Sequence, residues 1–175
     1  MERMGISFFI MSANIDEKSI RHDDARELTR AIAHAKADAL VAKITEPTIL
    51  ITADTVISIN GKIREKATTQ EEAAKFLREY GAYPLQTVSA IVVTNTETHE
   101  QKDGVGIATI WFRPIPEEVI AQMILRPDIC SFAGAFAYQD PLQRKYIDHV
   151  EGEEESILGL PKALTLRLIR EVGAI

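Results

Sequence analysis

The stretch from Ile49 to Ile59 constrains the fold more than any other part of the chain. It is rich in β-branched residues, and its continuous apolar lead-in over 49–51 is typical of a central strand that is buried on both faces. The Asn60-Gly61 pair that follows predicts a tight type I′ turn, which would join this strand to a short partner over 62–64. We therefore expect a hairpin near the middle of a sheet.

Asp54 lies in the middle of this predicted strand, with Thr55 beside it. An ionised carboxylate in apolar surroundings costs several kcal/mol or more unless it is paired, hydrogen-bonded or bound to a metal. Two interpretations follow from the residues alone. Asp54 is a site residue, or it is a turn or bulge aspartate that bonds local backbone groups.

Strand and helix signals alternate along all 175 residues, which predicts an α/β or α+β protein of one domain, or of one domain with two lobes. Asp24 with Glu27 and Thr69 with Glu72 have the spacing of helix capping boxes, and Gly81 is expected to end the second helix in the left-handed conformation. The pattern predicts helices over 24–43, 70–80, 116–125 and from 161 onward, and strands over 4–13, 49–59, 62–64, 85–94, 106–112 and 146–150.

The composition excludes several classes of protein. A formal net charge of −6 argues against a general nucleic-acid binder, because phosphate backbones are held by surplus lysine and arginine. No apolar run approaches the roughly 18 residues of a membrane span. The single cysteine, Cys130, cannot form an intrachain disulfide, and the four histidines lack metal-ligand spacing. These features favour a reducing compartment such as the cytoplasm.

Other residues that could form a site are few. Asp16 and Glu17 follow the apolar run of the N-terminal strand, a placement that suits a site but also an ordinary acidic loop. Lys36 borders the buried stripe of the first helix, where a solvated or snorkelling side chain is the common outcome. Lys66 precedes a helix N-terminus, where anions are favoured, and Gln139 follows a glycine- and alanine-rich turn.

Carboxylates and lysines without a histidine cluster suit a hard cation such as Mg²⁺ that holds phosphates. Lysines then act as point charges on the phosphate oxygens, and a carboxylate can activate water. The chain has no Walker A loop, no G-x-G-x-x-G fingerprint and no serine nucleophile elbow. Structural roles for these residues remain open at this point.

The chain resembles the Maf family of nucleoside triphosphate pyrophosphatases, also described as septum formation inhibitors, over nearly its whole length. Each matching motif is modest, but their shared order makes the resemblance specific. Six motifs carry it: Ile15-Asp16-Glu17, Ala33 to Ala37 (the A-x-x-K-A motif), Thr52 to Val56, Gly61 to Lys66, Ala133 to Asp140, and Glu151 to Pro161.

This resemblance implies a single Maf-like domain over residues 1–175, with two lobes around an elongated mixed sheet, flanking helices and an active-site cleft between the lobes. It implies hydrolysis of a nucleoside triphosphate to the monophosphate and pyrophosphate with Mg²⁺ or Mn²⁺, and a possible homodimer. Maf proteins are also linked to arrest of cell division, so a catalytically weak nucleotide-binding or regulatory homologue is the alternative.

The family's site residues map onto this chain position by position, and the resemblance implies their roles. The Asp54-Thr55 pair is similar to the branch that acts on dTTP and UTP, rather than to the branch that prefers 7-methyl-GTP. The implied site comprises Asp54 as catalytic acid or base and metal ligand, Thr55 beside it at the substrate, Lys36 and Lys66 on the phosphates, Glu17 on the metal or water, and Gln139 orienting the attacked phosphate.

Two departures from the family pattern bear on activity. Family members begin with a strand and an S-x-S-x-x-R loop whose arginine meets the triphosphate, and this sequence starts after that point. It is either truncated or an N-terminally shortened relative. Without the arginine loop only Lys36 and Lys66 would face the triphosphate, so we expect weaker binding of the substrate. Glu65 and Ala67 replace the usual glycine and proline, and Glu65 adds negative charge near the phosphates.

Overall fold

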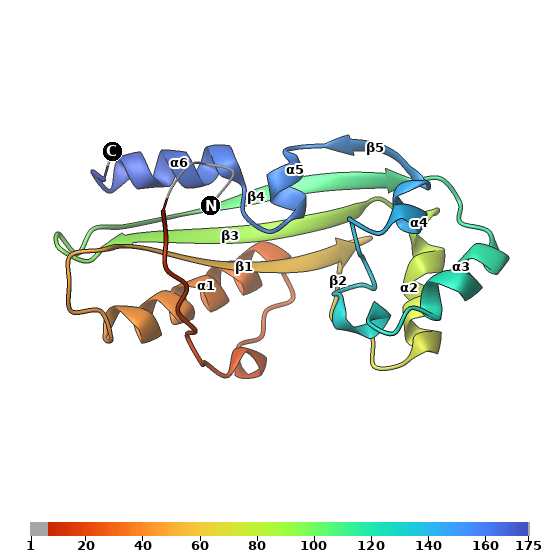
Figure 1. Cartoon of the computed structure of the whole chain (residues 1–175), viewed down its shortest axis with the longest axis horizontal. Coiled ribbons are helices and arrows are strands. Elements are labelled where there is room, and N and C mark those ends of the chain that lie inside the picture. The colour runs from red at the N-terminus through yellow and green to blue at the C-terminus, as the bar shows by residue number, and fades with distance from the viewer. Residues whose placement is uncertain (1–6, 175) are drawn as a thin grey trace.

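The structure is a computed structural model that describes residues 7–174. A five-stranded sheet in the order β2-β1-β3-β4-β5 runs along the molecule, with helices on both faces and around one end (Figure 1). The α/β class is confirmed. Every pair of neighbouring strands is antiparallel, so the sheet is antiparallel and not the mixed one that the resemblance implies. The elements are η2 (Glu17–Ser19), α1 (Ala25–Val41), β1 (Ile49–Ile59), β2 (Lys62–Arg64), α2 (Gln70–Tyr80), β3 (Leu85–Asn95), β4 (Gln101–Phe112), α3 (Glu117–Ile124), η3 (Ile129–Ser131), α4 (Pro141–Arg144), β5 (Ile147–Glu151), α5 (Glu154–Ile157) and α6 (Lys162–Glu171).

The three long strands β1, β3 and β4 form the centre of the sheet. β1 pairs with β3 over its full length, from Ile49 opposite Asn95 to Ile59 opposite Leu85. The β1–β2 turn is the one predicted, because Asn60 and Gly61 have φ angles of 50° and 70° and a type I′ turn requires positive values at both positions. The local turn chemistry therefore fixes the register of this hairpin.

The prediction of a central strand holds for only part of β1. β2 pairs only with Ile57–Ile59, so the first part of β1, over residues 49–56, has no strand beside it on that side within the described residues. An apolar run shows that a strand is covered, but it does not show how many strands pair with it. Asp54 lies in this part of β1.

The N-terminal strand predicted over 4–13 is also wrong for the residues that the structure describes. Residues 4–6 lie outside them, and residues 7–13 belong to no strand. Phe9 and Ile10 are almost fully exposed, at 104% and 90%. The apolar run has the composition of a strand, but a strand forms only where a partner edge is paired with it.

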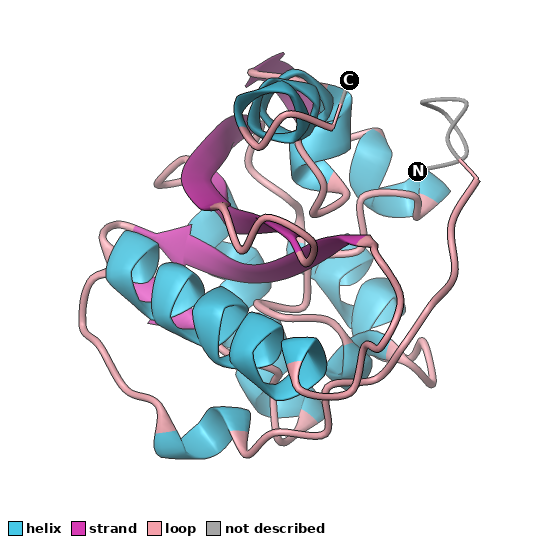
Figure 2. Ribbon diagram, turned by 90° about the vertical axis from the view of Figure 1, so that its left-hand side faces the viewer, coloured by secondary structure: helices cyan, strands magenta, loops and turns pink. Residues whose placement is uncertain are grey.

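Helices cover the two faces of the sheet at the end where β1 begins, and Figure 2 shows α1 and α6 on opposite sides of the strands. Ala33 and Ala37 are fully buried, which lets α1 approach the sheet closely, as its alanine content predicts. The opposite end of the sheet holds the largest apolar cluster, in which α2 and α3 pack with Tyr80 and Phe112. No helix within residues 7–174 is long and apolar enough to cross a membrane.

The helix ends show which local signals are reliable. Asp24 caps α1 as predicted, because its Oδ1 accepts hydrogen bonds from the backbone N–H groups of Arg26 and Glu27 at 2.8 and 3.1 Å. The prediction for Gly81 is wrong, since its φ of −76° is right-handed. A Cβ at Gly81 would lie 2.7 Å from Pro114 Cα, so close backbone approach explains the glycine.

Candidate active site

Lys36 on α1 is the centre of the best-defined polar cluster at the open edge of β1. Its Nζ lies 2.9 Å from Asp54 Oδ1 and 2.9 Å from Glu17 Oε1. It also donates a hydrogen bond to the backbone oxygen of Ala53 at 3.2 Å. Three of the predicted site residues, from η2, α1 and β1, are therefore in direct contact.

The packing of α1 on β1 produces this contact. Side chains on a strand alternate between its faces, so Thr52 and Asp54 both face α1. The Thr52 hydroxyl donates to the backbone oxygen of Ala33 at 2.8 Å, and this buried bond fixes the helix on the strand. Lys36 lies one turn farther along the helix, and its side chain is only 19% exposed. The interpretation of Lys36 as a freely solvated side chain is wrong.

Burial and charge shift the pKa values of this pair. Burial, together with the charge of Glu17, raises the pKa of Asp54 above its usual range, although the Lys36 ammonium lowers it. Burial alone would lower the pKa of Lys36, but its hydrogen bonds to Asp54 and Glu17 and their charges raise it above the usual lysine range. Lys36 is therefore a cation, and Asp54 is a stronger base than an exposed aspartate.

A cavity of about 460 Å³ adjoins this cluster between the N-terminal segment and the open edge of β1. Lys36 and Glu17 give it a polar wall, and Leu40 belongs to an apolar one. Its remaining lining comes from Met11 to Ile15 and from Ile51 to Ala53. A cavity lined by a lysine and one carboxylate, with Asp54 in contact with that lysine, suits a small polar or phosphorylated ligand.

Thr55 faces the opposite side of the sheet from Asp54. Its Oγ1 lies 2.8 Å from Ser89 Oγ and 3.5 Å from the backbone oxygen of Gly159. Gly159 has a φ of +90°, and a Cβ there would lie 3.1 Å from the Thr55 hydroxyl. Thr55 therefore joins β1 to the loop after α5. Sequence reasoning missed Ser89, because a serine within an apolar strand carries no signal of its own.

Lys66 lies just after β2, and its side chain is exposed. Its backbone forms an isolated β-bridge with Ala133, and Gly134 N–H donates to the backbone oxygen of Glu65 at 2.9 Å. The loop that carries Gln139 is therefore tied to the strand end that carries Lys66. Glu65 Oε1 lies 3.7 Å from Arg21 Nη1, so the negative charge that Glu65 adds has a countercharge nearby.

Gln139 is exposed and lines a second cavity, of about 370 Å³. Arg126 and Asp140 also line it, as do aromatic side chains and Leu158 of the loop that contacts Thr55. The structure therefore brings Glu17, Lys36 and Asp54 into contact, whereas Gln139 and Lys66 lie on neighbouring segments outside that cluster.

Glu17 and Asp54 are the carboxylates in this cluster that could bind a divalent cation. Glu17 and Asp54 supply carboxylate oxygens on either side of one ammonium group. Among residues 7–174, no cluster of three or more His, Cys, Asp or Glu side chains could hold an ion by itself. Mg²⁺ commonly binds through one or two carboxylates and takes its other oxygens from water and phosphates, so these two side chains have the right chemistry, with Lys36 Nζ now between them.

The fold and the cluster define an α/β protein with a lysine–carboxylate site suited to a phosphorylated substrate. Comparison with known proteins then identifies the family. Residues 1–172 match the family described as Maf-like protein, so the chain belongs to the Maf-like family, as its motifs predicted.

Named relatives extend this comparison. The chain is 40% identical over 177 residues to "7-methyl-GTP pyrophosphatase" of Dictyostelium discoideum, covering 97% of this chain and 89% of the relative. It is 26% identical over 175 residues to "dTTP/UTP pyrophosphatase" of Shigella boydii serotype 4 (strain Sb227), covering 100% and 87%. The "dTTP/UTP pyrophosphatase" of Pyrococcus furiosus is 30% identical over 161 residues, covering 92% and 82%.

Proposed function

We propose that this chain is a nucleoside triphosphate pyrophosphatase, which hydrolyses the bond between the α and β phosphates to give the monophosphate and pyrophosphate. The observation that carries the proposal is the contact of Lys36 with Asp54 and Glu17 at the rim of the first cavity. The names of the relatives support the same reaction class.

Asp54 is the group suited to activate water. Burial raises the pKa of Asp54, and a carboxylate with a raised pKa accepts a proton more readily than an exposed one. Lys36, which forms ion pairs with two carboxylates, has the length and charge to neutralise phosphate oxygens. Lys66, with its exposed ammonium, is the second phosphate ligand of the proposal.

The proposed cation, Mg²⁺ or Mn²⁺, binds through Glu17 and Asp54 together with substrate oxygens and water. When bound, it neutralises charge on the phosphates and makes them easier to attack. Gln139 orients the attacked phosphate from the second cavity. Thr55, on the opposite face of β1 from Asp54, holds the loop that carries Leu158 of that cavity. The location in the cytoplasm and a homodimer belong to the same proposal, and sedimentation analysis tests the dimer.

Two substrate preferences have separate support. The Asp54-Thr55 pair favours dTTP and UTP, by resemblance to the branch with that motif. The relative with 40% identity is named for 7-methyl-GTP, which favours the methylated guanine nucleotide. We propose dTTP and UTP as the main substrates, and 7-methyl-GTP is the competing candidate.

The test is pyrophosphate release from a panel of dTTP, UTP, CTP, GTP, ITP and 7-methyl-GTP with Mg²⁺ or Mn²⁺. Asp54→Asn removes the proposed base and keeps the side-chain size, and turnover should fall by at least about a hundredfold, the scale of general base catalysis. Asp38→Asn makes the same change at an exposed position of α1 and should leave turnover unchanged.

Each outcome of this panel is informative. Equal turnover by the wild type and Asp54→Asn would show that Asp54 is not the base. Absence of turnover in a folded protein whose melting temperature rises with nucleotide and Mg²⁺ would refute catalysis and leave the nucleotide-binding or regulatory homologue. A 7-methyl-GTP rate above the dTTP and UTP rates would assign the chain to the other branch.

A further inference from the structure

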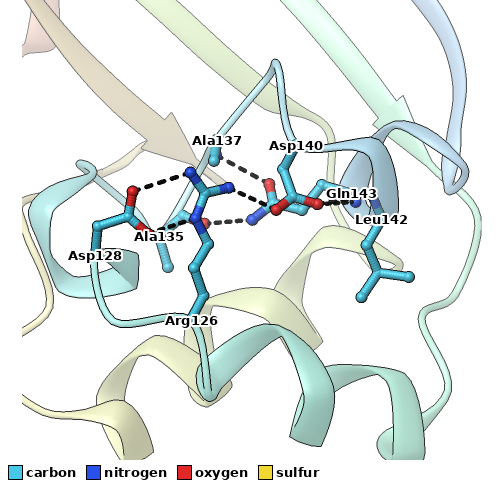
Figure 3. Close-up of polar contacts among 7 residues, drawn as sticks. All are labelled: Arg126, Asp128, Ala135, Ala137, Asp140, Leu142 and Gln143. Carbon is cyan, nitrogen blue, oxygen red and sulfur yellow. Dashed lines mark hydrogen bonds and ion pairs between the residues drawn. The ribbon is translucent and has the colours of Figure 1, made fainter.

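Gln143 is the most deeply buried amide side chain near the second cavity, with only 1% of its surface exposed. Its Nε2 donates a hydrogen bond to the backbone oxygen of Ala135 at 2.9 Å. Its Oε1 accepts one from the backbone N–H of Ala137 at 3.0 Å. One carboxamide therefore satisfies two buried backbone groups of the loop that precedes Gln139 (Figure 3).

This loop has a backbone that needs such support. Gly134 and Ala135 have φ angles of +62° and +58°, and a left-handed conformation is costly for a residue with a side chain. The buried Tyr80 hydroxyl donates to the backbone oxygen of Gly134 at 2.8 Å, next to the Gln143 contact. Strained backbone persists only where its surroundings hold it, and these two polar side chains add to the backbone bond from Gly134 N–H to the Glu65 oxygen.

Arg126 holds the other end of the loop. Its guanidinium pairs with Asp128, and its Nη1 lies 2.5 Å from Asp140 Oδ2. Asp140 Oδ1 in turn accepts hydrogen bonds from the backbone N–H groups of Leu142 and Gln143, at 2.7 and 3.0 Å, and so caps α4. Figure 3 shows this continuous path from the Arg126 side chain through Asp140 to Gln143.

Gln139 lies between the two supported ends. Asp140 N–H donates to the backbone oxygen of Ala137 at 2.9 Å, which makes residues 137–140 a tight turn with Gln139 as its third residue. The first residue of the turn is bound by Gln143 and the fourth by Arg126. Gln143 and Arg126 therefore set the position of Gln139 at the rim of the second cavity. Both are less exposed than Gln139 itself.

We propose that Gln143 and Arg126 are positioning residues for Gln139, which fix the 137–140 turn so that the Gln139 amide is held in place for the phosphates of the substrate. The inference rests on the proposed function, because Gln139 must contact the substrate for its placement to matter. Neither Gln143 nor Arg126 needs to touch the reacting atoms. They keep the loop ordered before the nucleotide binds, so binding does not have to supply the free energy of ordering it.

The test is a double-mutant cycle on kcat/KM. Gln143→Leu keeps the side-chain size and removes both hydrogen bonds to the loop, and we expect kcat/KM to fall about tenfold, the scale of coupling between residues in one network. In a Gln139→Ala background the same substitution should change kcat/KM less than about twofold, because the group that it positions is absent. Gln122→Leu, on the exposed face of α3, is the matched control.

A second substitution keeps the inference testable if Gln143→Leu does not fold. Arg126 is 33% exposed, so Arg126→Gln breaks the contact with Asp140 at less risk to the core. It should also lower kcat/KM, again only where Gln139 is present. Melting temperatures measured beside the kinetics confirm that the assay sees folded protein.

Gln143→Glu tests whether the two hydrogen bonds, rather than the size of the side chain, carry the effect of Gln143 on activity. A protonated glutamic acid can still accept from Ala137 N–H and donate to the Ala135 oxygen, whereas the carboxylate opposes that oxygen. Activity relative to wild type should therefore recover as the pH falls from about 8 to about 5, and Gln143→Leu should show no such recovery.

The outcomes separate this inference from the proposed function. Equal losses of kcat/KM with and without Gln139 would overturn the positioning role while leaving the enzyme intact. A Gln139→Ala variant as active as wild type would do the same, provided that Asp54→Asn is inactive. Absence of turnover by the wild type itself would overturn the proposed function, and the positioning role with it.

Discussion

Replacing Lys36 by methionine removes the cation that lies between Asp54 and Glu17 and nearly preserves the volume of the side chain. In the wild type, Lys36 Nζ lies 2.9 Å from both Asp54 Oδ1 and Glu17 Oε1. The variant leaves Asp54, whose side chain is only 11% exposed, without its partner. Glu17 is half exposed, so water replaces most of what it loses.

The expected cost follows from these exposures. A hydrogen bond to a charged group contributes about 1.5–3 kcal/mol, and a fully buried charge without a partner costs about 3–5 kcal/mol. Asp54 lies at an open strand edge where some water can reach it, so the lower range applies. We expect Lys36→Met to lower the free energy of unfolding by about 1.5–3 kcal/mol near neutral pH.

The sign of the pH dependence distinguishes this explanation from a packing effect. The pKa of Asp54 is already raised in the folded state, and the loss of Lys36 raises it further. A raised carboxyl pKa stabilises the folded state below the unfolded pKa, and this stability is lost as the pH rises through the folded pKa. The cost of Lys36→Met should therefore be largest near neutral pH and fall below about 1 kcal/mol near pH 4.

Urea unfolding of the wild type and the variant at both pH values measures this difference. Lys75→Met makes the same substitution on the exposed face of α2 and should cost less than about 0.5 kcal/mol at either pH. In an Asp54→Asn background, Lys36→Met should cost less, since no charge is left unpaired. An effect of equal size at both pH values would refute the electrostatic explanation and indicate lost packing instead.

Two further predictions concern the scaffold. Gly81→Ala should lower the free energy of unfolding by about 1–3 kcal/mol, because the new Cβ would lie 2.7 Å from Pro114 Cα. Thermal melting should show this loss. Gly61→Ala is the comparison, because Gly61 has a positive φ and no close neighbour. Asp24→Ala removes the acceptor for two backbone N–H groups of α1 and should cost about 1 kcal/mol in urea unfolding, whereas Asp24→Asn should keep most of that stability.

Features that depend on a few neighbouring residues could be predicted from the sequence. The Asn60-Gly61 turn and the Asp24 cap are local: each is decided by the φ preferences or side-chain oxygen of one or two residues. The span of α2 was predicted over 70–80 for the same reason, from a threonine cap at its start. Such signals need no knowledge of the rest of the fold.

Features that depend on distant pairing could not be predicted in the same way. The apolar segment before Ala13 has the composition of a strand, yet it is unpaired in residues 7–13, and β1 has an open edge where a central strand was expected. Gly81 looked like a helix stop, but its role depends on Pro114, which is distant in sequence. Contacts of this kind are set by topology and leave no local signal.

The candidate site was predicted in its parts rather than in its arrangement. Family resemblance selected Glu17, Lys36 and Asp54, and the structure places them in contact. The resemblance could not indicate that Ser89 contacts Thr55, because these two residues meet only through the register of β1 and β3. The register is decided by the whole β1–β3 ladder, which no short motif encodes.

The alternation of side chains along β1 explains how one two-residue motif makes contacts on both faces of the sheet. Asp54 faces α1 and contacts Lys36 beside the first cavity. Thr55 faces the other side, where it contacts the backbone of Gly159, next to Leu158 in the wall of the second cavity. A shift of one residue in the register of β1 would exchange these faces. The full-length pairing of β1 with β3 therefore holds the carboxylate and the hydroxyl on their correct sides of the sheet.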